Sequence, residues 1–539
     1  MNWYKGCFEH LSNGQAQGWA QADSGLPVRV GLYVDDVFIC AALADLPHTI
    51  KKNCGFALNL PPECFDDRLH AIDVRYEPVG VSINGLAFKI VPDGNQHLAP
   101  VSQADVQPDK SLPVLPYENR HTTSTVTPSL SRPRIAYILS TRMGGVPETN
   151  RDLMAALSDT YEPWVIICDS RCIDIYRFHP EGDIRVERAP LKNPVNPVTL
   201  ASDDYDIIMR DVLTRYGFDT IHIRHMGWHA ASLPALCRQL GLPVLMSLHD
   251  YYTVCPSIKL LDDKRQHCGG ICTDGQGHCE VELWRQDQFP PLKHAFVYHW
   301  RAHFDEALSH CNGFVTTSVA AQDILKQAHP GLQNADFRLI EHGRDFIPQS
   351  TRQTHWPMRD QKLKILIPGG ISPAKGADIV NALIALHTDG HCDFHILGNG
   401  WYIHKNSPHV FDHGAYERDE FAERVNAIAP HIGAVFSIWA ETYCHTLTEM
   451  WACGLPVLGL DIGAVGERIK THGGGWALPV DSNPADIYAH LLQIKYHTPI
   501  DPVRTQIEVW RQAHDQYHTT ADMAAEYDRF YRNLNNQRT

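Results

Sequence analysis

The stretch from Ser437 to Pro456, SIWAETYCHTLTEMWACGLP, places two carboxylates eight positions apart across the predicted start of a helix. Glu441 lies in the preceding loop and Glu449 lies two turns into the helix. The residues between them offer consecutive backbone N–H groups at a helix N-terminus, the partly positive end that holds phosphate. Carboxylates accept hydrogen bonds from sugar and ribose hydroxyls but cannot bind phosphate themselves. The stretch therefore predicts a site for a nucleotide-sugar.

The spacing Glu-x7-Glu, followed by Ala452-Cys453-Gly454-Leu455-Pro456-Val457, resembles the donor-site motif of the retaining glycosyltransferases of family 4, which have the GT-B fold. This resemblance implies that Glu441 holds the hydroxyls of the donor sugar and that Glu449 holds the ribose. The competing interpretation is an amphipathic helix with two solvated glutamates. The run from Gly454 to Gly459, which leads from the helix into a buried strand, favours the family, as do further matches along the chain.

Length and charge restrict the classes of protein that remain. At 539 residues the chain is too long for one core and predicts roughly three or four domains. Its 47 basic and 62 acidic residues give a net charge of −15, which argues against nucleic acid as a partner. The first residues lack the apolar segment of a signal peptide, and no run approaches the ~20 apolar residues of a membrane span. We therefore expect a cytoplasmic protein without a transmembrane segment.

Residues 1–95 alternate apolar and polar positions with period two, as in Val28, Val30, Leu32 and Val34 before an Asp35-Asp36 turn. Such short strands predict a small antiparallel β-sandwich. The pieces Gly18-Trp19-Ala20 and CGFALNLPP resemble a β-sandwich module appended to some bacterial glycosyltransferases. That module would bind carbohydrate or a partner surface, or serve as a structural or oligomerising appendage. Residues 96–132 are rich in proline, serine and threonine and predict a flexible linker.

A Rossmann-like domain is predicted from 133 to 350. The apolar run Arg134–Ser140 leads through Met143-Gly144-Gly145-Val146 into a helical pattern over 148–157, which is the order strand, glycine turn, helix. Further strands are expected over 164–168, 220–223 and 244–248, with helices between them. In family 4 the corresponding glycine loop faces the donor phosphate, so the resemblance adds Gly144 and Gly145 to the donor-binding residues.

His249 directly follows the last of these strands, and open α/β sheets bind their ligands at the carboxyl ends of strands. Its position resembles that of a family histidine expected near the donor sugar. A single histidine is more often structural. The earlier pair His222 and His225 resembles a less specific histidine pair of the family.

A second Rossmann-like domain is predicted over 351–515. Its first strand, 363–367, runs into Gly369-Gly370-Ile371-Ser372-Pro373-Ala374-Lys375-Gly376, where Lys375 can neutralise a diphosphate. The family pattern usually has an arginine five positions before this lysine, and Gly370 occupies that place here. The departure halves the positive side-chain charge expected at the diphosphate. Residues 516–539 predict a helix with one apolar stripe: Met523, Tyr527, Phe530 and Tyr531. The resemblance to GT-B enzymes, whose last helix crosses back to the first domain, implies that this stripe is buried there.

Four cysteines lie close together in one loop over 255–279, namely Cys255, Cys268, Cys272 and Cys279. Four thiolates can form a closed tetrahedral site for a structural Zn²⁺, although the spacing differs from the paired C-x2-C of a zinc ribbon. An iron–sulfur cluster, two disulfides and four reduced thiols remain as alternatives. No cofactor is expected for the chemistry itself.

The sequence thus predicts an α/β GT-B protein preceded by a small all-β domain. The resemblance implies transfer of a sugar from a nucleoside-diphosphate donor to a hydroxyl acceptor with retention of configuration. The acceptor is a glycan, a lipid-linked glycan or a protein, which leaves peripheral membrane association open. The alternative is a non-catalytic scaffold that binds sugar or nucleotide. Glu441, His249 and Lys375 are the expected catalytic residues, and the expected donor-binding residues are Gly144, Gly145, Gly369, Gly370, Lys375, Glu441, Tyr443, Cys444, His445, Thr446 and Glu449.

Overall fold

The structure is a computed structural model. It describes residues 4–536 except 13–14, 23–27, 35–36, 47–53, 61–69, 78–80, 84–87, 91–97, 101–131, 142–144, 274–276, 278, 347–354 and 388–389. Gly144 and most of the predicted linker fall outside the described residues. The chain divides into two compact units, Met1–Val126 and Thr127–Thr539.

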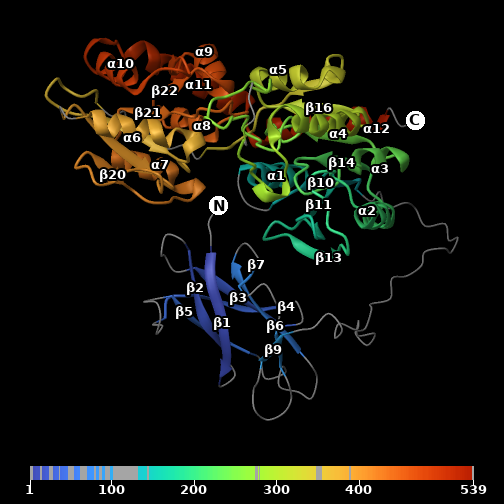
Figure 1. The fold of residues 1–539 in the computed structure, drawn as a ribbon. Helices are drawn as coiled ribbons and strands as arrows, with labels where there is room; N and C mark the ends of the chain where they lie inside the picture. The colour runs from blue at the N-terminus through green and yellow to red at the C-terminus, as the bar shows by residue number, and fades with distance from the viewer. Residues whose placement is uncertain are drawn as a thin grey trace. The chain divides into compact units, whose positions relative to one another are not determined.

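The first unit contains two small antiparallel sheets (Figure 1), with strand orders β1-β2-β5 and β4-β3-β6-β8-β9, and β7 paired to β6. Alternating apolar side chains from both sheets meet in one hydrophobic cluster that includes Val30, Leu32, Phe56 and Val74. The period-two pattern predicted this arrangement. The strands are β1 (Tyr4–Ser12), β2 (Gln15–Ala22), β3 (Arg29–Val34), β4 (Val37–Leu43), β5 (Gly55–Asn59), β6 (His70–Glu77), β7 (Val81–Ser82), β8 (Phe88–Ile90) and β9 (Leu98–Pro100).

Because each unit has its own core, a fragment that begins at residue 127 should fold without the first unit. We expect this fragment to be soluble and to unfold cooperatively, at a midpoint close to that of the corresponding transition in the full chain. Differential scanning calorimetry of both proteins tests this expectation. An insoluble fragment, or one that melts without a cooperative transition, would contradict it.

The second unit begins with an eight-stranded sheet of order β13-β12-β11-β10-β14-β15-β16-β17. Strands β10, β11 and β14 to β17 pair in parallel, whereas β12 and β13 are antiparallel additions at one edge. The strands and helices of this Rossmann-like domain are β10 (Arg134–Leu139), α1 (Gly145–Leu157), β11 (Glu162–Cys168), β12 (Cys172–Arg177), β13 (Ile184–Pro190), α2 (Asp203–Tyr216), β14 (Thr220–Ile223), α3 (Leu233–Gln239), β15 (Val244–Ser247), α4 (Val297–Ser309), β16 (Gly313–Thr316), α5 (Val319–Ala328) and β17 (Phe337–Leu339).

The following Rossmann-like domain has a six-stranded parallel sheet of order β20-β19-β18-β21-β22-β23. Its apolar strands are buried on both faces, as parallel sheets require. The elements are β18 (Leu363–Pro368), α6 (Ala377–Leu386), β19 (Cys392–Leu397), β20 (Val410–Asp412), α7 (Phe421–Ile428), β21 (Ile432–Val435), α8 (His445–Ala452), β22 (Val457–Leu460), α9 (Gly463–His472), β23 (Gly475–Leu478), α10 (Pro484–His497) and α11 (Asp501–Tyr517).

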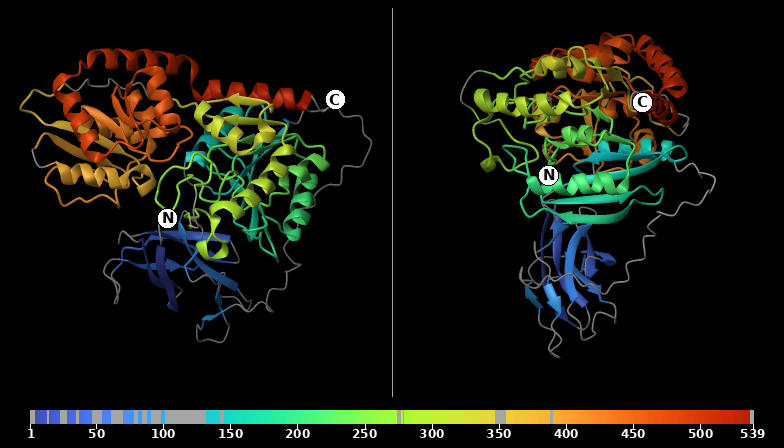
Figure 2. Two further views of the ribbon diagram at one scale, coloured as in Figure 1. Left: turned by 45° about the horizontal axis from the view of Figure 1, so that its top comes forward. Right: turned by 90° about the vertical axis from the view of Figure 1, so that its right-hand side faces the viewer.

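The last helix, α12 (Thr520–Asn536), lies against the first Rossmann-like domain (Figure 2). Its predicted stripe is buried in one cluster with β10 and α1. Met523, Tyr527, Phe530 and Tyr531 pack in the cluster that includes Ile135, Tyr137, Leu153 and Met154. Among the described residues, no helix is long and apolar enough to cross a membrane.

Candidate functional site

Lys375 and Glu441 form an ion pair at the carboxyl edge of the second sheet, with Nζ and Oε2 2.9 Å apart. Lys375 ends the turn after β18, and Glu441 lies in the loop between β21 and α8. The close approach depends on Gly376, where an added Cβ would lie 2.1 Å from the carbonyl oxygen of Phe436. Glu441 also accepts a hydrogen bond from Ser437 through Oε1, so both of its oxygens are held.

The charge state of Lys375 follows from this pair. Burial favours the neutral amine, but the negative charge of Glu441 outweighs it and raises the pKa of Lys375 above its ordinary value. Lys375 is therefore a cation at neutral pH. Its side chain is still 39 % exposed and can reach a ligand in the cleft.

The N-terminus of α8 lies between glycines from both Rossmann-like domains. An added Cβ at Gly145 would lie 3.4 Å from the imidazole of His445, and one at Gly369 would lie 3.1 Å from Cγ2 of Thr446. The first turn of a helix has N–H groups without intrahelical acceptors. The structure thus brings together Gly145, Gly369, His445 and Thr446, which the sequence placed at the donor phosphates.

Three imidazoles from different segments stack beside this turn. His342 lies between His249 and His445, with ring centroids 5.0 Å away on each side. Burial holds the pKa values of His249 and His342 well below the ordinary value, and burial with nearby cations lowers the pKa of His445 to about 3. All three rings are neutral at physiological pH. Both ring nitrogens of His249 are buried without a hydrogen-bond partner among the described residues.

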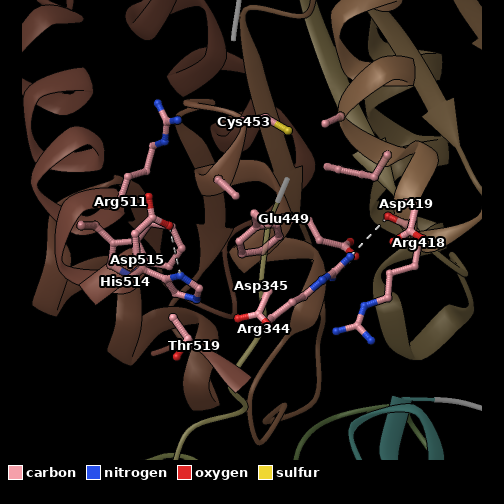
Figure 3. A pocket seen from close by; sticks show the side chains of 15 residues that line it. Arg344, Asp345, Arg418, Asp419, Glu449, Cys453, Arg511, His514, Asp515 and Thr519 are labelled. Atoms are coloured by element: carbon pink, nitrogen blue, oxygen red, sulfur yellow. Dashed lines mark hydrogen bonds and ion pairs between the residues drawn. The ribbon is translucent and has the colours of Figure 1, made fainter. Parts of the chain in front are cut away.

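Glu449 is paired with Arg344, which the sequence analysis did not assign to the site (Figure 3). Nη1 of Arg344 donates to Oε1 of Glu449, and the hydroxyl of Tyr416 donates to Oε2 at 3.4 Å. Nη2 of Arg344 donates to the carbonyl of Arg418, whose own guanidinium pairs with Asp152 on α1 at 2.7 Å. Glu449, Arg344 and Arg418 line a cavity of about 380 Å³ that also contacts α7 and α11.

Replacing Glu449 with alanine is expected to weaken nucleoside-diphosphate binding by about 1–3 kcal/mol, the range for a lost hydrogen bond to a charged group. It should also destabilise the fold by about 3–5 kcal/mol, because it leaves Arg344 buried without its counter-ion. The double variant Arg344→Met, Glu449→Ala separates the two effects. We expect it to regain stability in thermal melts but not affinity in titration calorimetry. Unchanged affinity in both variants would contradict the ribose assignment.

The other residues that were singled out from the sequence differ in their surroundings. His222 lies inside the fold, hydrogen-bonded to Tyr531 and Ser247, while His225 contacts Ser140 and Asp250. Gly370 has no atoms within 4 Å of an added Cβ, so its place is open. Tyr443 packs its ring against His342, and Cys444 adopts a left-handed conformation with φ 73°.

The four cysteines of the 255–279 loop are not joined by disulfide bonds, so the structure does not contain the alternative of two disulfides. In the part of the chain that is described, no three histidine, cysteine, aspartate or glutamate side chains come close enough to hold a metal ion. The structure therefore supplies no preformed geometry for zinc, and the metal site stays a prediction.

The zinc prediction has a direct test. If the site exists, purified protein carries about one zinc per chain, as a closed four-ligand site requires. Elemental analysis together with thiol titration measures this. Four reactive thiols and no metal would reject the site.

Comparisons with known proteins bear on the family and the fold. Residues 143–346 match the model of Glycosyltransferase Family 4. No curated protein matches the chain. Among solved structures, sucrose-phosphate synthase from Thermosynechococcus elongatus is 15% identical and aligns with a TM-score of 0.52, covering 75% of this chain and 99% of its own. A glycosyltransferase from Rickettsia africae is 14% identical, with a TM-score of 0.49 and coverage of 75% and 98%. Anabaena HepE in complex with UDP-glucose is 12% identical, with a TM-score of 0.46 and coverage of 74% and 99%.

At these identities the likeness to the synthase shows a shared fold alone. The predicted fold class is therefore confirmed: two Rossmann-like domains in the GT-B arrangement, preceded by small antiparallel sheets. The family match covers the first Rossmann-like domain, and together with the fold it supports a glycosyltransferase.

Proposed function

We propose that this protein is a retaining glycosyltransferase that moves a sugar from a nucleoside-diphosphate sugar to a hydroxyl acceptor. One observation carries the proposal: the Lys375–Glu441 pair adjoins the free N-terminus of α8, and Gly145 of the other domain lies against the same turn. A cation, a carboxylate and a set of backbone N–H groups thus converge at the carboxyl edges of two sheets, where such folds bind ligands.

In the proposed reaction the bond between C1 of the sugar and the diphosphate oxygen breaks, and its electron pair stays on the leaving diphosphate. Lys375 and the N–H groups at His445 stabilise the developing negative charge. The acceptor oxygen forms the new bond to C1 on the face that the diphosphate leaves, which retains the configuration. The acceptor proton passes to the departing phosphate. Glu441 holds the sugar hydroxyls and keeps C1 in place.

The proposal also assigns binding groups to the sugar, the ribose and the nucleobase of the donor. Buried polar atoms in folded proteins almost always have partners, so the two unpartnered nitrogens of His249 are available to sugar hydroxyls. Glu449 has accepting capacity beyond its bond to Arg344, because an ionised carboxylate offers about four lone-pair positions. The half-buried ring of Tyr416 lies beside this carboxylate and offers an aromatic surface for a nucleobase.

Gly370 favours a second candidate, a scaffold that binds nucleotide-sugars without turnover, because the family arginine is missing there. A panel of UDP-, GDP-, ADP- and dTDP-sugars separates the two. A bound donor raises the melting temperature by mass action. For an enzyme, the same donor should release nucleoside diphosphate slowly in water and faster with acceptor. Stabilisation without any release would identify the scaffold, and neither effect with any donor would reject both functions.

A further inference from the structure

Arg468 on α9 is a buried cation directly behind the start of α8. It is 4% exposed. Nη1 donates to the carbonyl oxygens of Tyr443 at 3.0 Å and Cys444 at 3.3 Å, and Nη2 donates to Oγ1 of Thr448 at 2.8 Å. The guanidinium also lies over the rings of Tyr443 and Trp451, with its central carbon 4.4 and 5.4 Å from the ring centroids. Arg468 is therefore locked in one position against the turn.

No carboxylate pairs with Arg468 within the described part of the chain, and its Nε is buried without a hydrogen-bond partner. This is unusual, because buried charges in proteins are normally paired with an opposite charge. Lys375, in contrast, forms an ion pair with Glu441, and Arg344 forms an ion pair with Glu449. Arg468 is thus a cation beside the α8 turn that no carboxylate neutralises.

The bonds from Arg468 also fix the direction of the neighbouring N–H groups. In a planar trans peptide the C=O and the N–H point in opposite directions. Because the carbonyls of Tyr443 and Cys444 point at Arg468, the N–H groups of Cys444 and His445 point away from it. The left-handed conformation of Cys444, which is unfavourable for a residue with a side chain, is part of this turn.

We infer, on the basis of the proposed function, that Arg468 is a positioning residue for the leaving diphosphate. It aims the N–H groups of Cys444 and His445 at the phosphates and supplies from behind the positive charge that Gly370 does not. The charge reaches the phosphate side of the turn, since Arg468 is one of the cations that depress the pKa of His445. The site therefore has two cations, Lys375 and Arg468, although Gly370 stands where the family pattern usually has an arginine.

Binding of UDP, GDP, ADP and dTDP, each compared with its own nucleoside, tests this inference by titration calorimetry. For the nucleoside diphosphate that binds the unchanged protein, Arg468→Met should weaken affinity about tenfold or more, as expected for a lost charge-assisted interaction. Affinity for the matching nucleoside should change less than about twofold, because nothing at the ribose or base is altered. Adding Gly370→Arg to this variant should restore much of the diphosphate affinity, since the place is open.

Arg301→Met is the matched control, because Arg301 is also a buried arginine that donates to two carbonyls, those of Val254 and Gly270, and does not contact α8. It should leave the ratio of diphosphate to nucleoside affinity unchanged.

Equal losses of affinity for diphosphate and nucleoside in Arg468→Met would overturn the inference, as would failure of Gly370→Arg to restore diphosphate affinity. If Arg468→Met does not fold, Arg468→Lys serves as the second variant, because the compact ammonium of lysine lacks the planar fork with which arginine donates to both carbonyls and Thr448. Wild-type diphosphate affinity in the lysine variant would overturn the inference, whereas a selective loss that Gly370→Arg repairs would support it. Failure of the unchanged protein to bind any of the four diphosphates would instead reject the proposed function.

Discussion

Replacing Glu441 with glutamine is expected to reduce turnover about 100-fold, the scale of a small misplacement of reacting groups, while nucleoside-diphosphate affinity stays the same or rises. The carboxylate contacts Lys375 and Ser437 and is assigned to the sugar, so its charge adds nothing to nucleotide binding. Without it, the ammonium of Lys375 loses its counter-ion and interacts more strongly with phosphate. Turnover and affinity should therefore move in opposite directions.

The freed lysine also gives this variant a pH signature. Glu441 is what keeps the pKa of Lys375 above its ordinary value against the effect of burial, so the glutamine variant should have a lower lysine pKa. Lysine binds phosphate as a cation, so diphosphate affinity of the variant should decline at a lower pH than in the unchanged protein when pH is raised. Calorimetry from pH 6 to pH 10 measures this shift.

Asp393→Asn is a matched control for Glu441→Gln. Asp393 also pairs with a lysine, Lys362, at 3.1 Å, but it lies near the amino end of β19, at the opposite edge of the same sheet. It should leave turnover within about twofold, because Asp393 lies at the end of the sheet away from Lys375 and Glu441. Parallel losses of turnover and diphosphate affinity in Glu441→Gln would contradict the assignment of this residue to the sugar.

Local sequence patterns predicted the second unit well, because its parallel strands are short apolar runs closed by glycine turns. The predicted strand over 220–223 coincides with β14, and the strand over 363–367 differs from β18 by one residue. The pair β12 and β13 was not predicted. The half-exposed alternation of β13 gives a weak apolar signal, and its place at the sheet edge depends on pairing that no local pattern encodes.

In the site, too, residues that belong to a local motif were predicted, whereas residues that depend on distant partners were not. The two glutamates and Lys375 carry motif spacing, so the sequence identified them. Arg344, Arg418 and Arg468 carry no such signal, because each acts through a partner far along the chain or through backbone carbonyls. Arg344 lies in the segment that follows β17. Its pairing with Glu449 arises from how the two Rossmann-like domains meet, which sequence spacing does not show.

The crossing helix yields a large expected change in stability. Tyr531 on α12 is fully buried, and its hydroxyl lies 2.7 Å from Nδ1 of His222 and 3.3 Å from the hydroxyl of Tyr137. Tyr531→Ala should lower the free energy of unfolding by about 3–5 kcal/mol, the usual range for removing a large buried aromatic side chain. Tyr531→Phe keeps the ring but leaves His222 without one partner, and should cost about 1–3 kcal/mol.

These two variants and Arg529→Ala form a series on one helix. Arg529 is 66% exposed and pairs with Glu526 one turn away, so its removal should change stability by less than about 0.5 kcal/mol. Urea denaturation followed by tryptophan fluorescence measures all three. The loss in free energy of unfolding should be largest for Tyr531→Ala, smaller for Tyr531→Phe and smallest for Arg529→Ala, because α12 stabilises the first domain through its buried stripe alone. Since Ser247, which bonds His222, lies two residues before His249, the alanine variant should also lose activity at temperatures where the unchanged protein is folded. Equal stability of Tyr531→Ala and Arg529→Ala would show that the buried stripe of α12 does not stabilise the first domain.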